Sequence, residues 1–431
     1  MLAKLDTIDW VDLSHAYGSA ADVPDQIRAL RSADRAVRER ALGELYANIF
    51  HQGTRYQASA AAVPFLLELL ADPSTPERSA VLGLLTGLAI GYDEAHLPAG
   101  YAIAAHREAA EGGPELMADV MSRMAAERNG PGAEGDAPED EDDEDAYDDE
   151  DSLYAYLGEL DDQDQNRVHA WFALAAYDAV RAGLPLVRAL LDAEDPGLRS
   201  TAAHALAWFP EEAPAGVPAL ISLAEDPDPV VAATALAAVG LLATPGAERV
   251  TPALEAALDG PGELVRWGAA TALARLHGPA GGHHRAAEEL RARLTGHGER
   301  GAEVPFLDGD VRGYAALSLC QFDGAGADAT FTALLASLPD VSGTEALPVA
   351  EAALRLAFPG GRLPDRTPFA ALDDRQRRLL RVLADSPGTW RLGGRSFGNF
   401  ALLVSGYGLP CDADALAAYT TGAASPADRA R

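Results

Sequence analysis

The apolar residues of this chain recur at helical spacing, in short blocks separated by turn residues. Residues 36–49, 58–70 and 76–90 each place apolar side chains three or four positions apart, so that they share one face of a helix. The pair Asp72-Pro73 stands between two of these blocks and is typical of a helix boundary. The pattern therefore predicts consecutive pairs of amphipathic helices.

A turn followed by an alanine-rich helix recurs in the second half of the chain. Residues 195–206 read Asp-Pro-Gly-Leu-Arg-Ser-Thr-Ala-Ala-His-Ala-Leu, and residues 264–273 and 311–319 resemble them closely. Residues 228–241 match in part, with Val231 in place of the arginine. The equivalent positions 167, 199, 231 and 266 are spaced by 32, 32 and 35 residues, a period typical of stacked helix-turn-helix repeats.

The motif Asp-Pro-x-Val-Arg-x-x-Ala-Ala-x-Ala-Leu resembles the signature of HEAT and HEAT-like repeats. Residues 48–56 and 397–403 make the whole chain similar to bacterial HEAT-repeat proteins. The resemblance implies an all-α fold, a right-handed α-solenoid of roughly eight helical pairs. It implies no activity, because the same repeat serves scaffolds, nucleic-acid enzymes and chromophore lyases.

Each part of the motif has a structural interpretation. The Asp and Pro residues end one helix and begin the next, and the alanines let neighbouring helices approach closely. We expect Arg199, Arg266 and Arg312 to pair with acidic residues or helix-end carbonyls of the adjoining turn.

One segment interrupts the repeats. Residues 129–166 hold 17 acidic residues and no basic one, so like-charge repulsion predicts disorder over residues 130–150. We therefore expect four parts: N-terminal HEAT-like repeats (1–129), an acidic low-complexity insert (130–166), central HEAT-like repeats (167–345), and degenerate repeats with a cap (346–431).

Composition restricts the partners and the compartment. The net charge is −32, which disfavours nucleic acid and favours a basic protein. Cys320 and Cys411 stand in unrelated contexts and make no disulfide framework. The apolar runs are too short to span a membrane, and the N-terminus lacks a signal-peptide pattern. These features predict a cytoplasmic protein.

The sequence contains no Walker loop, nucleophile elbow or dinucleotide fingerprint in the right context. Four histidines around a glycine-rich loop, at positions 277, 283, 284 and 297, do not converge as zinc ligands would. The acidic run lacks the glycine and glutamate spacing of an EF-hand loop. We therefore expect no catalytic residue, no cofactor and no metal, and a protein that is not an enzyme.

Two groups of residues are candidates for partner binding. The loop residues His51, Arg55 and Tyr56 include residue types that are enriched at binding hot spots, and capping or packing is the alternative. A second group, His204, Trp208 and Trp267, lies on the repeat helices, where core packing is the alternative to exposure in a groove.

We expect a scaffold that binds a macromolecule, most concretely a basic protein, on its concave surface, with an antitoxin or immunity protein as one form. The first alternative is a HEAT-like-repeat enzyme acting on nucleic acid, such as a DNA glycosylase. It would need a basic groove lined by Arg266, Arg312, Trp208 and Trp267. The second is a chromophore-lyase-like module with a pocket for a small molecule.

Overall fold

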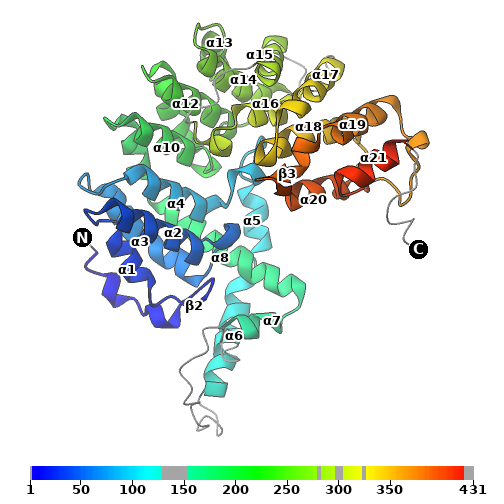
Figure 1. Ribbon diagram of the computed structural model, residues 1–431. Helices are drawn as coiled ribbons and strands as arrows, with labels where there is room; N and C mark the ends of the chain where they lie inside the picture. The colour runs from blue at the N-terminus through cyan, green and yellow to red at the C-terminus, as the bar shows by residue number, and fades with distance from the viewer. Residues whose placement is uncertain (1, 129–152, 279–282, 297–303, 323–326, 422–431) are drawn as a thin grey trace. The chain divides into compact units, whose positions relative to one another are not determined.

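A computed structural model describes residues 2–128, 153–278, 283–296, 304–322 and 327–421 (Figure 1). It confirms the all-α helical-repeat fold class, and in these ranges the strands form only two short hairpins. These are β1 (Ser14–His15) with β2 (Gly18–Ser19), and β3 (Arg391–Leu392) with β4 (Arg395–Ser396). The predicted disordered stretch 130–150 lies outside the described residues. None of the described helices combines the length and the apolar character needed to cross a membrane.

The chain divides into two compact units. Unit 1 comprises Met1–Ala95 and Tyr101–Ala193, and unit 2 comprises His96–Gly100 and Glu194–Arg431. The short segment 96–100 thus packs with unit 2 although both of its flanks belong to unit 1. The carbonyl of Ala99 accepts a hydrogen bond from Arg275 Nε at 2.7 Å. The four-part division drawn from the sequence stays a prediction.

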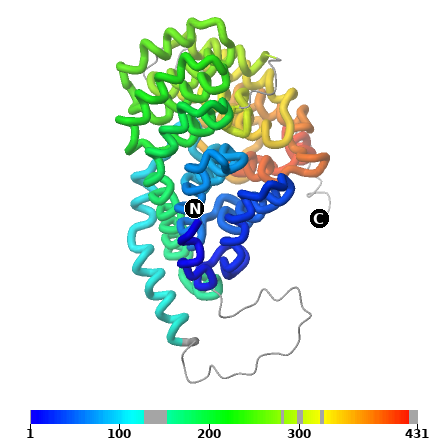
Figure 2. The backbone as a smooth tube through the Cα atoms, turned by 90° about the vertical axis from the view of Figure 1, so that its left-hand side faces the viewer, coloured from blue at the N-terminus to red at the C-terminus, as the bar shows by residue number. Residues whose placement is uncertain are grey.

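Unit 1 is built around one long helix, α8 (Asp162–Ala182), which packs against four others: α3, α4, α5 and α6. Figures 1 and 2 show α6 and α8 side by side over much of their length. The remaining bounds of this unit are α1 (Val23–Ala29), α2 (Arg35–Asn48), α3 (Gln57–Ala71), α4 (Arg78–Ile90), α5 (Ile103–Ala109), α6 (Gly113–Arg128), α7 (Leu153–Gly158) and α9 (Leu184–Ala189).

Single residues determine where α6 and α8 begin. The predicted break near Gly112-Gly113-Pro114 is confirmed. Gly113, the first residue of α6, packs closely on α8, because a Cβ added there would stand 2.6 Å from Trp171 Cβ. Helix α8 begins at Asp162, five residues before the predicted restart at Arg167. The reason is that Asp161 caps it by accepting from Asp164 N at 2.9 Å, so acidic residues that looked like insert form the first turn.

Unit 2 contains the predicted ladder of repeats. Successive helices pack along it in the order α10, α12, α14, α16 and α18, and the predicted succession of helices is confirmed, although α11, α13 and α17 pack on the ladder helix that follows each of them. The ladder helices are α10 (Pro196–Leu206), α12 (Pro229–Leu242), α14 (Glu263–His277), α16 (Val311–Leu319) and α18 (Ala346–Ala357). The others are α11 (Ala213–Ser222), α13 (Thr251–Leu258), α15 (His284–Thr295), α17 (Ala327–Ser337), α19 (Asp374–Asp385), α20 (Gly398–Gly406) and α21 (Ala413–Thr421).

Small residues let α12 and α14 approach each other closely. Every residue from 231 to 242 is buried. A Cβ added at Gly268 would stand 2.4 Å from Ala233 O, and one added at Gly240 would stand 2.5 Å from Ala272 Cα. The alanine-rich motif therefore acts through backbone proximity, as the sequence predicts.

Two of the repeat arginines each bind the turn that precedes their helix and a carboxylate later in the chain. Arg199 donates two 2.9 Å hydrogen bonds to Asp226 and one of 3.0 Å to Glu194 O. Arg266 pairs with Glu289 at 3.0 Å and donates to Pro261 O at 2.9 Å. The predicted pairing is confirmed for these two arginines.

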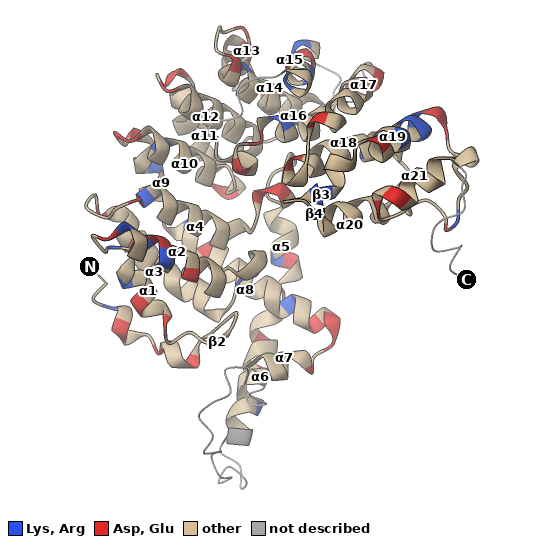
Figure 3. Ribbon diagram, viewed as in Figure 1, with Lys and Arg blue, Asp and Glu red and all other residues tan. Residues whose placement is uncertain are grey.

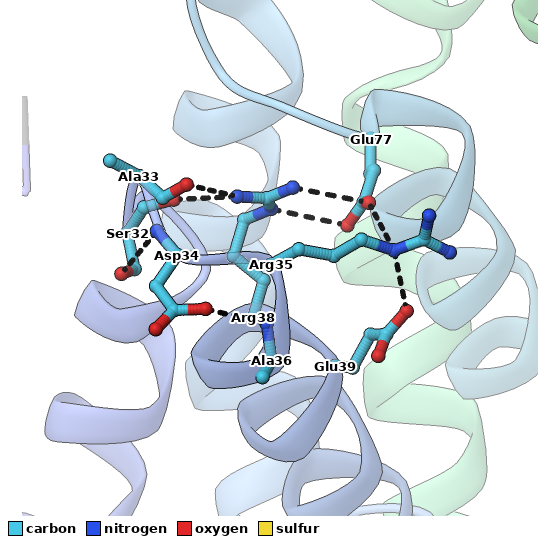
Figure 4. A network of polar contacts seen from close by, with 8 residues as sticks. All are labelled: Ser32, Ala33, Asp34, Arg35, Ala36, Arg38, Glu39 and Glu77. Carbon is cyan, nitrogen blue, oxygen red and sulfur yellow. Dashed lines mark hydrogen bonds and ion pairs between the residues drawn. The ribbon is translucent and has the colours of Figure 1, made fainter.

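The same combination of a capping aspartate and a paired arginine occurs in unit 1, where the repeat motif is degenerate. Arg38 forms two 3.2 Å hydrogen bonds to Glu77 and donates to Ser32 O at 2.8 Å (Figure 4). Asp34 caps α2 by accepting from Ala36 N at 2.9 Å. Asp34 and Arg38 therefore correspond to the cap and the arginine at positions 195 and 199.

For Arg312 the predicted pairing stays a prediction. The Nη1 atom of Arg312 is buried and has no hydrogen-bond partner among the described residues. The cap here is Asp310, which accepts from Gly313 N at 2.8 Å, so cap and arginine are two residues apart instead of four.

Candidate functional site

Among the described residues of unit 1, the most exposed aromatic side chains surround the loop between α2 and α3. The loop contains η3 (His51–Gly53) and turns sharply because Gln52 and Gly53 adopt φ values of 49° and 82°. Its end is fixed by Ser59, whose hydroxyl donates to Ile49 O and accepts from Tyr56 N, both at 2.7 Å. The loop is therefore held on both sides by adjoining helices.

Two tyrosines from distant parts of the sequence flank this loop. The Tyr17 hydroxyl lies 3.2 Å from His51 Nδ1, with the rings edge to face at 5.3 Å. The Tyr92 ring lies against the Gly53 backbone, where a Cβ would stand 3.0 Å from Tyr92 Cε2. Tyr17 and Tyr92 are 47% and 50% exposed. We call Tyr17, His51, Gly53 and Tyr92 the His51 surface.

The hairpin that carries Tyr17 is anchored by a polar cluster in which buried His15, Gln26 and Asn48 surround an exposed Asp22. Tyr17 N donates to His15 Nδ1 at 3.1 Å, so the proton of the His15 ring is on Nε2, which donates to Asp22 Oδ1 at 3.0 Å. Asp22 also accepts from Gln26 at 2.6 Å and from Asn48 at 2.8 Å. Both His15 nitrogens are therefore engaged, and the cluster positions Tyr17.

The predicted loop residues divide between surface and interior. His51 is partly exposed, as a contact residue requires. Arg55 is turned inward: its Nη1 donates to Gly53 O, its Nε is buried with no hydrogen-bond partner in the described chain, and burial lowers its pKa. Tyr56 is 8% exposed and packs edge-on against Tyr154, and burial raises its pKa. Arg55 and Tyr56 thus pack beneath the loop.

The other predicted residues, His204, Trp208 and Trp267, lie in the interior of unit 2. Both tryptophans are fully buried, and Trp267 Nε1 donates to Val311 O at 3.0 Å. His204 is nearly buried, with its ring 4.7 Å from that of Phe306 and 5.5 Å from that of Trp208. These side chains stabilise the ladder. Partner contact through them stays a prediction that would require this packing to open.

Tyr17 and Tyr92 were missed in the sequence because each stands outside any motif and far from the loop. The signal that existed was weaker: an exposed tyrosine beside a glycine turn in Tyr17-Gly18, and another directly after the glycine that ends α4 in Gly91-Tyr92. Only the fold brings them to His51.

Unit 1 also has an open hollow of about 690 Å³ between α5 and the start of α8. Its lining residues are mostly polar or charged: Glu108, Glu111, Gln163, Asn166 and Arg167, with Ala109. Ligand pockets are mostly apolar with a few convergent polar groups, and this wall differs from that pattern. Among the residues with described positions, no three His, Cys, Asp or Glu side chains are grouped as metal ligands.

The charge distribution does not favour the groove required for a nucleic-acid enzyme. Arg266 is paired with Glu289, and the two tryptophans that would stack on bases are buried. In Figure 3 acidic residues stand at the ends of many helices of unit 2.

Comparison with known proteins places the repeats in the middle of the chain. A family model described as HEAT repeats matches residues 151–240 and 217–301. No curated protein has a significantly similar sequence. Among solved structures, the chain is similar to one titled as the complex of CpcE and CpcF of phycocyanin lyase from Nostoc sp. PCC7120. The identity is 16%, the similarity covers 83% of this chain and 91% of that chain, and the TM-score is 0.42. It is also similar to an engineered protein, with 17% identity, coverage of 84% and 94%, and a TM-score of 0.28.

Proposed function

We propose, from the premise that this chain is a HEAT-repeat protein over residues 151–301, that it is a scaffold for a protein partner. We further propose that the His51 surface of unit 1 is a binding surface for a basic partner. The observation that carries this proposal is the pair of half-exposed tyrosines held against one anchored loop.

Physical chemistry favours protein binding at such a surface. Tyrosine rings bury a large area at low cost in conformational entropy, and they are enriched among the residues that dominate binding energies. Because Tyr17 and the loop are already anchored, little further order must be imposed when a partner binds.

The charge of the chain favours a basic partner. Exposed aromatic faces attract arginine and lysine side chains. Asp12 and Asp22, both exposed, flank the hairpin beside the rings on its two sides in sequence, and the net charge of −32 attracts cationic proteins over a longer range. An antitoxin or immunity role would be one form of this binding.

We infer a binding role and not a catalytic one. His15 has both ring nitrogens engaged within the chain, and His51 Nδ1 contacts the Tyr17 hydroxyl. A general base needs a nitrogen free to exchange a proton with a substrate, so His15 is unsuited to that role.

The test is affinity purification of partners from the native organism, followed by measurement of Kd with the purified partner. We expect Tyr17→Ala and Tyr92→Ala each to raise Kd about tenfold or more. Leu402→Ala, which truncates a side chain that is 70% exposed in unit 2, is the matched control and should leave Kd unchanged. Circular dichroism verifies that each variant is folded.

Salt provides the second readout. Binding of a basic partner should weaken as ionic strength rises, because exposed charges are screened. The proposal fails if the recovered partners are neutral or acidic, or if both tyrosine variants bind them as tightly as the unaltered chain.

A further inference from the structure

One segment of this acidic protein has the opposite charge. Residues 361–395 contain eight arginines and four aspartates, with no lysine or glutamate, in a chain of net charge −32. Four of the arginines lie on α19, at positions 375, 377, 378 and 381, and Figure 3 shows them as a dense basic stretch.

Two of these four arginines are used within the fold. Arg375 pairs with Asp328 and donates to Leu356 O at 3.4 Å. Arg377 pairs with Asp374 at 2.7 Å and also donates to Leu372 O. Arg375 thus holds α19 to α17 and α18, whereas Arg377 binds the start of its own helix.

The other two, Arg378 and Arg381, are exposed and lie over aromatic rings, Arg378 over the same Phe331 ring as Arg375. The guanidinium of Arg378 lies 5.7 Å from the centre of the Phe331 ring, and that of Arg381 lies 5.4 Å from that of Phe369. They are three residues apart, so both project from one face of the helix. Within the described residues neither donates a hydrogen bond or forms an ion pair.

Stacking determines what these groups can bind. A ring beneath a guanidinium restricts the orientation of its plane and leaves the N–H edge directed outward. That edge matches the two oxygens of a carboxylate, and the resulting paired hydrogen bonds are among the strongest in proteins. Two such groups on one helix face are therefore preorganised for two acidic side chains.

We propose that Arg378 and Arg381 form a docking surface for an acidic peptide segment of a protein partner. This surface lies in unit 2, differs in charge from the His51 surface, and does not depend on the proposed function. It would let the scaffold hold an acidic segment as well as a basic partner.

An acidic peptide fits this surface better than nucleic acid does. At physiological salt, exposed charges are screened beyond about 8 Å, so a short peptide senses mainly the local arginines. A nucleic acid is a long polyanion whose binding needs a continuous basic stripe, and it would extend over the acidic remainder of a chain of net charge −32.

The test is fluorescence anisotropy with the full chain and a labelled peptide of alternating aspartate and serine. We expect binding that Arg378→Ala/Arg381→Ala weakens about tenfold or more. Lysine at both positions should restore it only in part, because an ammonium group lacks the planar fork.

The matched control is Arg391→Ala/Arg395→Ala. It removes the same charge from the exposed β3–β4 hairpin, where no ring stacks on either arginine in the described chain, and it should leave the affinity unchanged. The proposal is overturned if this control weakens binding as much as the α19 variant, since the effect would then be one of net charge. It is also overturned by tighter binding of a single-stranded oligonucleotide of equal charge, or by no peptide binding at about 1 mM.

Discussion

The arginine that follows a helix cap recurs in both units with the same bonds. Arg38, Arg199 and Arg266 each donate to carbonyls five or six residues earlier and to a carboxylate later in the chain. The pairings of Arg199 and Arg266 could be predicted because the motif around them is well preserved in the sequence. Arg38 was missed although Asp34-x-x-Val37-Arg38 was available as a signal, because the helix that follows lacks the alanine pair.

Removal of one of these arginines should destabilise the protein. Arg199 and Asp226 have side chains that are only 14% and 10% exposed, so Arg199→Ala leaves a carboxylate with little access to water. We expect a loss of about 1–3 kcal/mol in the free energy of unfolding, measured by urea denaturation. Arg285→Ala breaks the Arg285–Asp259 pair, which is more than half exposed, and should cost about 0.5 kcal/mol or less. Equal losses would contradict the structural role of Arg199.

The carboxyl group of Asp310 should make stability depend on pH. Burial raises the pKa of Asp310 to about 6; Glu345 also raises it, while the Gly313 amide and Arg312 lower it. Because the folded state holds the proton more tightly than the unfolded state, stability is greatest below pH 4 for this group and falls as the pH rises from about 4 to about 6.

Asp310→Asn should remove that decline, because asparagine caps a helix and does not ionise. At pH 7.5 the variant should be more stable than the unaltered chain by about 1–3 kcal/mol, and at pH 4 the difference should vanish. Asp195→Asn, at an exposed cap, is the control and should change stability by less than about 0.5 kcal/mol at either pH. The measurement is urea denaturation of both variants at the two pH values. If the stability of both variants changed with pH in the same way, the raised pKa of Asp310 would be refuted.

Among the elements, α12 and α14 depend most on small residues. In Gly268→Ala the new methyl group would clash with Ala233 O, and overpacking of this kind costs about 1–3 kcal/mol. The gain in helix propensity is about 1 kcal/mol, so we expect a net loss of up to about 2 kcal/mol. Gly43→Ala on α2 meets nothing within 4 Å and should stabilise by up to about 1 kcal/mol. Urea midpoints measure both, and stabilisation by both would show that α12 and α14 separate easily.

Periodicity in the sequence predicts that most of the helices exist. It predicts less well where each helix begins and in which direction individual side chains point. The sequence predicts the start of α8 too late in the chain, because a run of aspartates suggests mutual repulsion and disorder. At a helix N-terminus the same negative charges stabilise the helix. The loop at His51 was identified, yet the inward direction of Arg55 depends on contacts with Gly53 and Gly91 that periodicity does not encode.

At the scale of the whole molecule, the repeat class could be predicted because several copies of one motif share a period. The candidate surface could not be, because Tyr17 and Tyr92 are 75 positions apart in sequence and meet the loop only through the fold. The division into two units was also out of reach, since no change in apolar pattern marks residues 96–100.

The segment His96–Gly100 has a consequence for the gene. A single cut between codons 193 and 194 would leave the Ala99 carbonyl on the first product and the Arg275 guanidinium that uses it on the second. Neither product would be a complete structural module, so recombination at that point would not transfer either unit intact. The two units are therefore expected to be inherited together, although each has a core of its own.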